Sequence, residues 1–326
     1  MEVLTLSTNS ISTQLKEEET STNKPFILAN TFQSSYHELR QEHLIPVFVK
    51  DNQPVISQAD FIEMTNEVVS HVYDGEEILI PNIRVSHPIK GRIPEAKNKP
   101  AHLLLEEEKT IYYERMAFVI EVPSISSIIN GSKLNLTIGG IKAYNLDNLY
   151  SKKGSEEHFK IFIGFQNKVC TNLCISTDGY SGELRVRNTQ DLMDGILKLL
   201  TQYNAQRHIE NLASFQNFIL PQKEFAQLIG KARMYTFLNK KDKMHLPELQ
   251  FGDTQLGMVV KDYYNDEAFC HMENGSIDLW RLYNLFTGSN KSSYIDTFFD
   301  RSVNAYEFMT SIFQAKKESK SHWFLD

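Results

Sequence analysis

The chain has 326 residues, of which 41% are apolar, and a formal net charge of −7 at pH 7. This length and composition allow a full hydrophobic core, and three cysteines are typical of a reducing cytoplasm rather than of a disulfide framework. The apolar runs are far shorter than the roughly 20 residues that a membrane helix needs, so we expect a cytoplasmic protein that does not contact a membrane.

Residues 1–25 are predicted to form a disordered tail. The segment MEVLTLSTNSISTQLKEEETSTNK is rich in Ser, Thr and Glu and has few large apolar side chains with which to offset the entropy of ordering. It lacks the basic and apolar regions of a signal peptide, so secretion is not expected. We divide the rest into a β-rich region, 26–190, and a helical region, 191–326, packed together as one unit.

The first predicted elements after the tail are a hairpin and a helix. HLIPVFVKDNQPVIS suggests short strands at 45–49 and 55–57, joined by a turn at 51–54. Ser57 then precedes QADFIEMTNEVVSHVY, whose apolar residues follow helical spacing. Ser57 is therefore predicted to be the N-cap of a helix.

From about residue 77 to 188 the apolar period is two, which predicts at least five antiparallel strands. KTIYYERMAFVIEVP is expected to form one long strand that ends at Pro123. Gly139-Gly140 suggests a bulge or kink within a strand, and turns are expected at Gly154 and at Asp178-Gly179.

The remainder of the chain is predicted to be mostly helical. In QDLMDGILKLLTQYNAQRHIENLASFQNFIL, the residues Leu192, Ile196, Leu199, Leu200 and Tyr203 form one apolar stripe, and Pro221 ends the pattern. Further helices are expected at 222–239, 255–264, 277–286 and 304–314. The predicted fold class is α+β, with a central, mainly antiparallel sheet and a helical C-terminal half packed on it.

The stretch KVCTNLCISTDG holds two of the three cysteines, Cys170 and Cys174. Its alternating Val, Thr, Leu and Ile residues favour a strand, in which positions four apart lie about 13 Å from each other. At that separation the two thiols can form neither a disulfide nor a shared zinc site. We therefore expect a strand and an Asp-Gly turn, whereas a helix would bring the two thiols close together.

Enzymatic signatures are weak. The sequence contains no phosphate-loop, Gly-x-Ser-x-Gly, His-Glu-x-x-His or kinase motif. Asp262, Asp266 and Cys270 would share a face if helical, and Glu114 and Asp147 could act as acid and base, but neither set has further partners. We expect no cofactor, no metal and no catalytic residue, and a dispersed-carboxylate hydrolase or nuclease is the least favoured alternative.

Basic residues concentrate in the middle of the chain. Residues 80–190 contain 15 Lys/Arg and 11 Asp/Glu, whereas residues 1–79 contain 4 and 13. A local basic surface with aromatic side chains can bind phosphates and stack bases even on an acidic protein. The candidate nucleic-acid-binding residues are Arg84, Lys90, Arg92, Lys97, Lys99, Tyr113, Arg115, Arg185 and Arg187. The alternative is an ordinary solvated basic surface, with Tyr112 or Tyr113 in the core.

Several segments together resemble an uncharacterised bacterial family found on mobile elements such as conjugative elements, plasmids and phages. They are RVSHPIKGRIPEA, KTIYYERMAFVIEVP, LTIGGIKAYNLDNLY, FKIFIGFQNKVCTNLCISTDG and IDLWRLYNLFT. KVCTNLCISTDGY, LRVRNT and LWRLYNLFT are more distantly similar to the phage/plasmid-like protein family. The resemblance implies a bacterial cytoplasmic protein encoded on mobile DNA and supplies no activity.

Two partner classes follow from these observations. We expect a non-enzymatic accessory protein that binds DNA or RNA through the basic central region. The alternative is a protein-interaction module in which the acidic first 79 residues contact a host or element-encoded protein. The sequence leaves the oligomeric state open.

Overall fold

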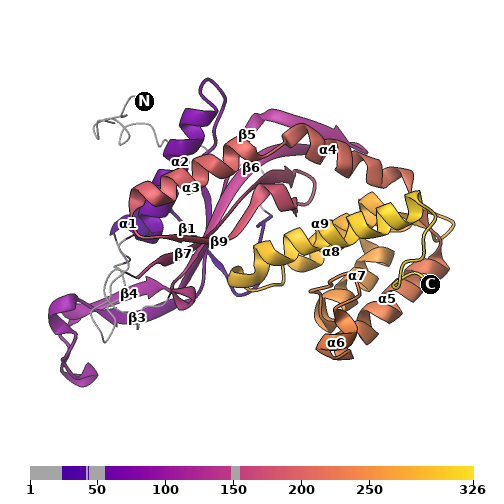
Figure 1. Cartoon of the computed structure of the whole chain (residues 1–326). Coiled ribbons are helices and arrows are strands. Elements are labelled where there is room, and N and C mark those ends of the chain that lie inside the picture. The colour runs from indigo at the N-terminus through magenta and orange to yellow at the C-terminus, as the bar shows by residue number, and fades with distance from the viewer. Residues whose placement is uncertain (1–23, 42, 44–55, 148–154) are drawn as a thin grey trace.

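The computed structural model describes residues 24–41, 43, 56–147 and 155–326 (Figure 1). The expected tail, apart from its last two residues, lies outside the described residues. So do the expected hairpin, apart from its end at residues 56 and 57, and the turn at Gly154. Among the described residues, no helix combines the length and the apolar character that crossing a bilayer would take.

The fold is built on a curled, seven-stranded antiparallel sheet (Figure 1). The strand order is β1-β2-β5-β6-β7-β8, and β9 also pairs with β7. The bounds are β1 (Phe32–Ser34), β2 (Asn82–Val85), β5 (Arg115–Ile129), β6 (Ser132–Ala143), β7 (Glu157–Asn167), β8 (Leu173–Cys174) and β9 (Tyr180–Val186). With the helical half described below, the predicted α+β class is confirmed.

The longest hairpin, β5–β6, turns at Asn130-Gly131. Both residues have positive φ, 47° and 77°, and Ile129 pairs directly with Ser132. A two-residue turn with two positive φ angles matches the right-handed twist of the flanking strands. Asn-Gly therefore fixes the register of the two strands that form the centre of the sheet.

The expected single strand over KTIYYERMAFVIEVP is wrong. β4 (Lys109–Tyr113) ends before Glu114 and pairs with β3 (Pro88–Arg92) in a separate two-stranded ladder, while β5 starts at Arg115 and runs past Pro123. The register of β5 against β6 shifts between Val122 and Ser126. Proline has no N–H to donate, and this irregularity accommodates it inside a strand.

The expected bulge at Gly139-Gly140 is also wrong. Val119 pairs with Gly139 and Phe118 with Gly140 in unbroken register. A Cβ on Gly139 would lie 2.4 Å from the Phe118 carbonyl oxygen, and one on Gly140 would lie 2.4 Å from Cζ of Phe61. The two glycines allow close packing on both faces of the sheet rather than a kink.

Helices cover both faces of this sheet. α2 (Gln58–Val72) and α3 (Thr189–Gln202) lie on one face, where Phe61 packs edge-on against Phe118, and α1 (Tyr36–Gln41) lies beside α2. On the other face, Phe299 of α9 (Ile295–Lys317) packs against Phe162. The Ser57 N-cap is confirmed, because its hydroxyl accepts from the Asp60 N–H in a complete capping box.

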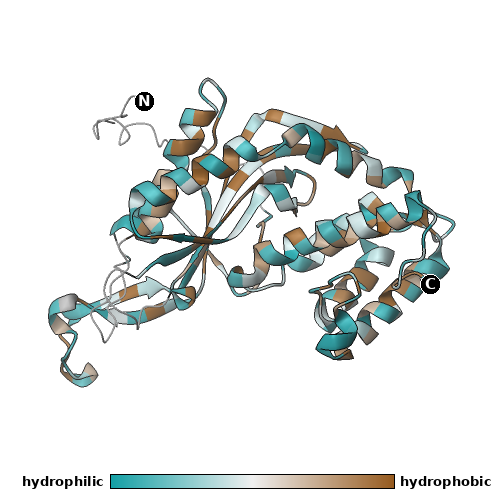
Figure 2. Cartoon of the chain, viewed as in Figure 1, coloured by the Kyte–Doolittle hydropathy of each residue, from teal (hydrophilic) through white to brown (hydrophobic). Residues whose placement is uncertain are grey.

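The C-terminal half is a helical lobe whose core continues that of the sheet (Figure 1). It contains α4 (Ala205–Ser214), α5 (Gln222–Phe237), α6 (Lys240–Lys243), α7 (Asp253–Asn265) and α8 (Leu279–Asn290), with a short ladder of β10 (Ile219–Leu220) and β11 (Ile277–Asp278). The predicted stripe on α3 is buried at Leu192, Ile196, Leu199 and Leu200. The helix expected at 304–314 is the inner part of the longer α9. Figure 2 shows hydrophobic residues along parts of the central strands, whereas α6 is hydrophilic.

Candidate nucleic-acid interface

The β3–β4 ladder and the residues between its strands form an arm, residues 88–113, that projects from the body of the molecule (Figure 1). Lys90 pairs with Ile111 and Arg92 with Lys109. Directly opposed residues and residues two apart share one face of an antiparallel ladder. Lys90, Arg92 and Lys109 therefore lie on one face of the ribbon, and Lys90 and Lys109 are exposed.

Carboxylates neutralise part of this charge. The arm contains five Lys/Arg and four Glu. Lys99 lies 2.7 Å from Glu108, where its hydrogen bond is the main cause that lowers the pKa of that carboxyl. Lys109 lies 2.5 Å from Glu106, while the guanidinium of Arg92 donates to the carbonyl oxygen of Lys99. Two of the predicted residues, Arg92 and Lys99, thus also hold the arm together; Lys97 is exposed between them.

Tyr113, the predicted stacking residue, is buried at the base of the arm. Its hydroxyl donates to Glu38 at 3.1 Å, and its ring is stacked on His43 with the centroids 4.1 Å apart. Its ring is therefore part of the packing between the arm and α1. A nucleobase would therefore have to stack on another aromatic side chain.

Arg84 and Arg115 lie in the body, away from the tip of the arm. The guanidinium of Arg84 donates to the carbonyl oxygen of Thr31 at 2.7 Å, which joins β2 to the segment before β1, and burial lowers its pKa. Arg115 lies between Glu114 at 3.2 Å and Asp296 at 3.5 Å, and so links β5 to α9. Both arginines serve the packing of the sheet.

Arg185 and Arg187 lie on and just after β9, at another edge of the sheet. Each is exposed and paired with a carboxylate, Arg185 with Glu183 at 3.1 Å and Arg187 with Glu156 at 3.0 Å. The fold therefore gathers four of the nine predicted residues, Lys90, Arg92, Lys97 and Lys99, on the projecting part of the arm, with Tyr113 buried at its base. The other four lie elsewhere.

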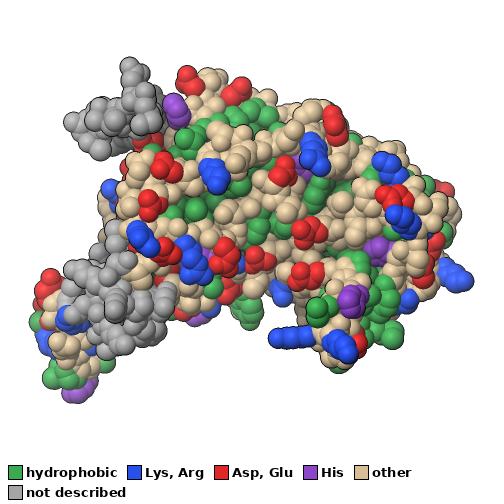
Figure 3. Space-filling model, in the orientation of Figure 1, with side chains coloured by type: hydrophobic (Ala, Val, Ile, Leu, Met, Phe, Trp, Pro, Cys, Tyr) green, Lys and Arg blue, Asp and Glu red, His purple; other side chains and the backbone are tan. Residues whose placement is uncertain are grey.

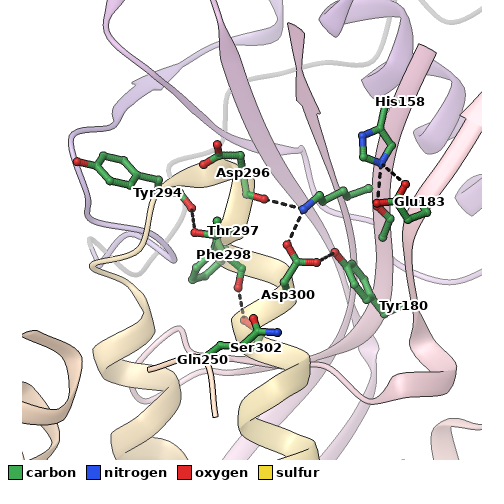
Figure 4. Close-up of polar contacts among 12 residues, drawn as sticks. His158, Tyr180, Glu183, Gln250, Tyr294, Asp296, Thr297, Phe298, Asp300 and Ser302 are labelled. Atoms are coloured by element: carbon green, nitrogen blue, oxygen red, sulfur yellow. Dashed lines mark hydrogen bonds and ion pairs between the residues drawn. The ribbon is translucent and has the colours of Figure 1, made fainter. Parts of the chain in front are cut away.

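Polar contacts close to β9 attach α9 to the sheet (Figure 4). Asp300 accepts from the Tyr180 hydroxyl at 2.7 Å and from the ammonium of Lys160 at 2.5 Å. His158 lies 3.7 Å from Glu183 on the neighbouring strand. The bonds of Asp300 to Tyr180 and Lys160 join α9 to the sheet, which indicates a structural role.

A second basic surface is not predicted from the sequence, because residues 191–326 are slightly acidic as a whole. We define the helix tip as residues 231–245, the end of α5 together with α6; it contains five Lys/Arg and one Asp. Figure 3 shows Lys and Arg side chains at the lower edge of the lobe, where Figure 1 places α6. Counting charges over a shorter stretch of sequence identifies this surface.

The carboxylates considered for catalysis are engaged in ion pairs. Lys142 is fully buried, with its ammonium 2.8 Å from both Asp147 and Glu157 and 4.0 Å from the centroid of the Phe159 ring. Glu114 is paired with Arg115. α7 ends at Asn265, so Asp262 and Cys270 do not share a helix, and the described part of the chain holds no group of three metal-ligating side chains.

The expected strand through both Cys170 and Cys174 is wrong at Cys170, whereas the expected turn at Asp178-Gly179 is confirmed. The segment forms a tight turn, in which Thr171 has φ 58°, followed by the two-residue strand β8 and a 3₁₀ turn at Thr177–Gly179. The 13 Å separation of an extended strand therefore does not apply. Both thiols are free, and burial raises the pKa of Cys170 to about 11 and that of Cys174 further, so neither is a thiolate at neutral pH.

This turn instead docks the sheet on α8. The amide of Asn172 donates to the backbone carbonyl of Asn284 at 2.9 Å, and that of Asn167 donates to its side chain at 3.1 Å. The ammonium of Lys291 donates to the Cys170 carbonyl and, at 2.9 Å, to the Thr171 hydroxyl. The asparagine amides thus join the sheet to α8, and the Cys170 thiol also lies 3.9 Å from the side-chain oxygen of Asn284.

A cavity of about 220 Å³ lies where the arm meets the body. Arg40, Asp60, Tyr112 and Tyr144 are among the side chains that line it. Arg40 lies 2.9 Å from Glu63 and 3.4 Å from Asp60, so its charge is compensated within the wall. The lining offers hydrogen bonds but no uncompensated charge for an ionic ligand.

The fold and these surfaces define an α+β protein with two basic projections. A family model described as "Domain of unknown function, B. Theta Gene description (DUF3871)" matches residues 6–325. The chain belongs to this family. Comparison with curated proteins and with solved structures gave no significant match. The family description gives no activity, so the mobile-element setting stays a prediction.

Proposed function

We propose that the chain is a non-enzymatic accessory protein of a bacterial mobile element that binds nucleic acid, single-stranded or without sequence preference, through the arm. The observation that carries this proposal is the shared ribbon face of Lys90, Arg92 and Lys109 on a projecting hairpin. A two-stranded ribbon fits the major groove of a duplex, and a line of cations can equally follow the backbone of a single strand.

A protein partner is the second candidate. Leu103 and Leu105, between the strands of the arm, and Ile111 on β4 are exposed apolar side chains on the same projection. Exposed aliphatic groups favour a protein surface over a phosphate backbone. If the arm docks on a protein, the double substitution Leu103→Ser with Leu105→Ser should weaken binding to that protein. The affinity for the protein should then depend less on salt concentration than nucleic-acid binding does.

The proposed function is tested by a salt titration of binding to single-stranded and duplex DNA. Reversing the exposed cations, Lys90→Glu with Lys109→Glu, should weaken binding and reduce the slope of log K against log salt by about 1.4 for a single strand. Lys133→Glu with Lys198→Glu, exposed and outside both basic surfaces, makes the same change in net charge and is the matched control. Absence of binding at low salt, or equal effects of the two pairs, would contradict the proposal.

A further inference from the structure

We propose that the helix tip is a second nucleic-acid contact, where a base of a single strand stacks on Phe237 and neighbouring phosphates lie beside Lys240 and Lys241. This inference rests on the proposed function and adds to it a site and a mode of recognition. The partner's chemistry is that of a flexible polyanion with unpaired bases.

The charge of the helix tip runs against that of the whole chain. Five Lys/Arg and one Asp occur in 15 residues of a protein with net charge −7. Lys240 and Lys241 are exposed, and no carboxylate of the described residues lies within ion-pair distance of either. The one acidic residue, Asp242, accepts from the Asn239 amide at 2.7 Å and so belongs to the α6 cap. The excess charge therefore faces solvent.

Other cations of the helix tip are already engaged. Arg233 lies 3.0 Å from Asp253, Lys231 lies over the Trp323 ring at 5.2 Å, and Lys243 lies over the Tyr235 ring at 4.8 Å. These contacts hold the side chains of Lys231, Arg233 and Lys243 against the helical lobe. Lys240 and Lys241, at the first turn of α6, are left as the cations that can meet an incoming phosphate.

The apolar side chains of the helix tip are unusually exposed. Phe237 is 84% exposed at the last position of α5, Met244 is 77% exposed just after α6, and Met234 is 62% exposed. Only Leu238 and Asn239 separate Phe237 from Lys240 in the sequence. The Phe237 ring and the ammonium groups of Lys240 and Lys241 therefore lie on adjacent elements joined by a two-residue connection. Base stacking on an exposed aromatic ring is tolerant of sequence, as the proposed function requires.

A membrane surface would use the same residue types in a different arrangement. Interfacial helices present a continuous apolar face opposite a polar one. Here Lys231 and Arg233 lie within a turn of Met234, and α6 has only four residues, so cations and apolar groups are interspersed. Interspersed charge and aromatic surface matches the alternation of phosphate and base along a single strand.

Stacking can be separated from charge with two fluorescent probes, an oligothymidylate and an abasic deoxyribose-phosphate oligomer of equal length. Phe237→Ala should weaken oligothymidylate binding by roughly 5- to 100-fold and leave the abasic probe nearly unchanged, while Phe237→Trp restores binding. Ile128→Ala, a similarly exposed apolar residue on the β5–β6 hairpin, is the control. Lys240→Glu with Lys241→Glu should weaken both probes and reduce the salt slope by about 1.4.

The outcomes distinguish this inference from the proposed function. Wild-type binding that weakens in the arm variants but is unchanged in Phe237→Ala would overturn the helix-tip site and leave the arm. No wild-type binding at low salt would overturn both. Binding to phosphatidylserine vesicles that Phe237→Ala abolishes, with oligothymidylate binding unaffected, would assign the surface to a membrane instead. Thermal unfolding of each variant checks that the fold is retained.

Discussion

His208 on α4 is a buried imidazole within a cluster of aromatic rings. Its Nδ1 lies 2.7 Å from the Tyr203 hydroxyl, and the rings of Phe165 and Tyr306 lie 5.7 and 5.1 Å from it. Burial lowers the pKa of His208 to about 3, so the ring is neutral at pH 7. Protonation of His208 at low pH should therefore destabilise the packing of the lobe around it.

The unfolded chain binds one more proton at His208 than the folded chain between the ordinary pKa of 6.5 and about 3. Stability should therefore fall as the pH drops through this window, by about 1.4 kcal/mol per pH unit from this group. His208→Gln should make the pH dependence of urea unfolding shallower by that amount between about pH 6 and pH 4. The exposed His245→Gln is the control, and an unchanged slope in His208→Gln would refute the assignment.

Counting Lys and Arg along the sequence predicted part of the candidate site. Lys90, Arg92, Lys97 and Lys99 lie close together because they are close in sequence. Arg115 meets Asp296 across the fold, a contact that no local window contains. Averaging over 191–326 hid the helix tip, because the acidic residues that cancel its charge lie on other elements.

At the scale of elements, the Gly139-Gly140 pair decides how closely helices and strands approach. Gly140→Ala would place a methyl group 2.4 Å from the buried Phe61 ring, and Gly139→Ala would meet the Phe118 carbonyl. Each substitution should lower the free energy of unfolding by about 1–3 kcal/mol, measured by chemical denaturation.

The matched control for these substitutions is Gly257→Ala, inside α7, where an added Cβ meets nothing within 4 Å. It should stabilise the protein by about 0.5–1 kcal/mol, because alanine loses less backbone entropy in a helix. A Gly140→Ala protein as stable as wild type would show that the sheet and α2 can separate without cost.

The sequence predicted which segments form strands but not where those strands end. The period of two identifies β5, β6 and β7, whereas the break at Glu114 is set by tertiary pairing, since β4 pairs with β3 and β5 with β2. Likewise, Asn167 and Asn172 form a turn at the cysteine pair because their amides bind α8, a contact made across more than one hundred residues. Local alternation alone favoured a strand there.

At the scale of the whole molecule, stability is expected to come from the sheet, α2, α3 and the lobe rather than from the arm. The arm forms its own ladder, and of its residues only Tyr113 belongs to the two described core clusters. Arg92 and Lys109 are a direct cross-strand pair, so Asn-Gly can replace residues 93–108 between them.

This excision should leave thermal unfolding cooperative and shift the melting temperature by no more than about 4 °C, since it removes little buried surface. The excision removes Lys97 and Lys99 but retains Lys90, Arg92 and Lys109, so nucleic-acid binding through the shared ribbon face should be retained. Loss of cooperative unfolding would instead show that the arm stabilises the body.

The sequence by itself determined which region is rich in strands and which in helices, the capped start of α2 and the basic composition of the arm, because each depends on residues close together in the chain. The tertiary structure decided which cations are compensated, where the long strand is divided and why the two glycines are needed. Those features depend on groups brought together by the packing of the sheet against α2, α8 and α9.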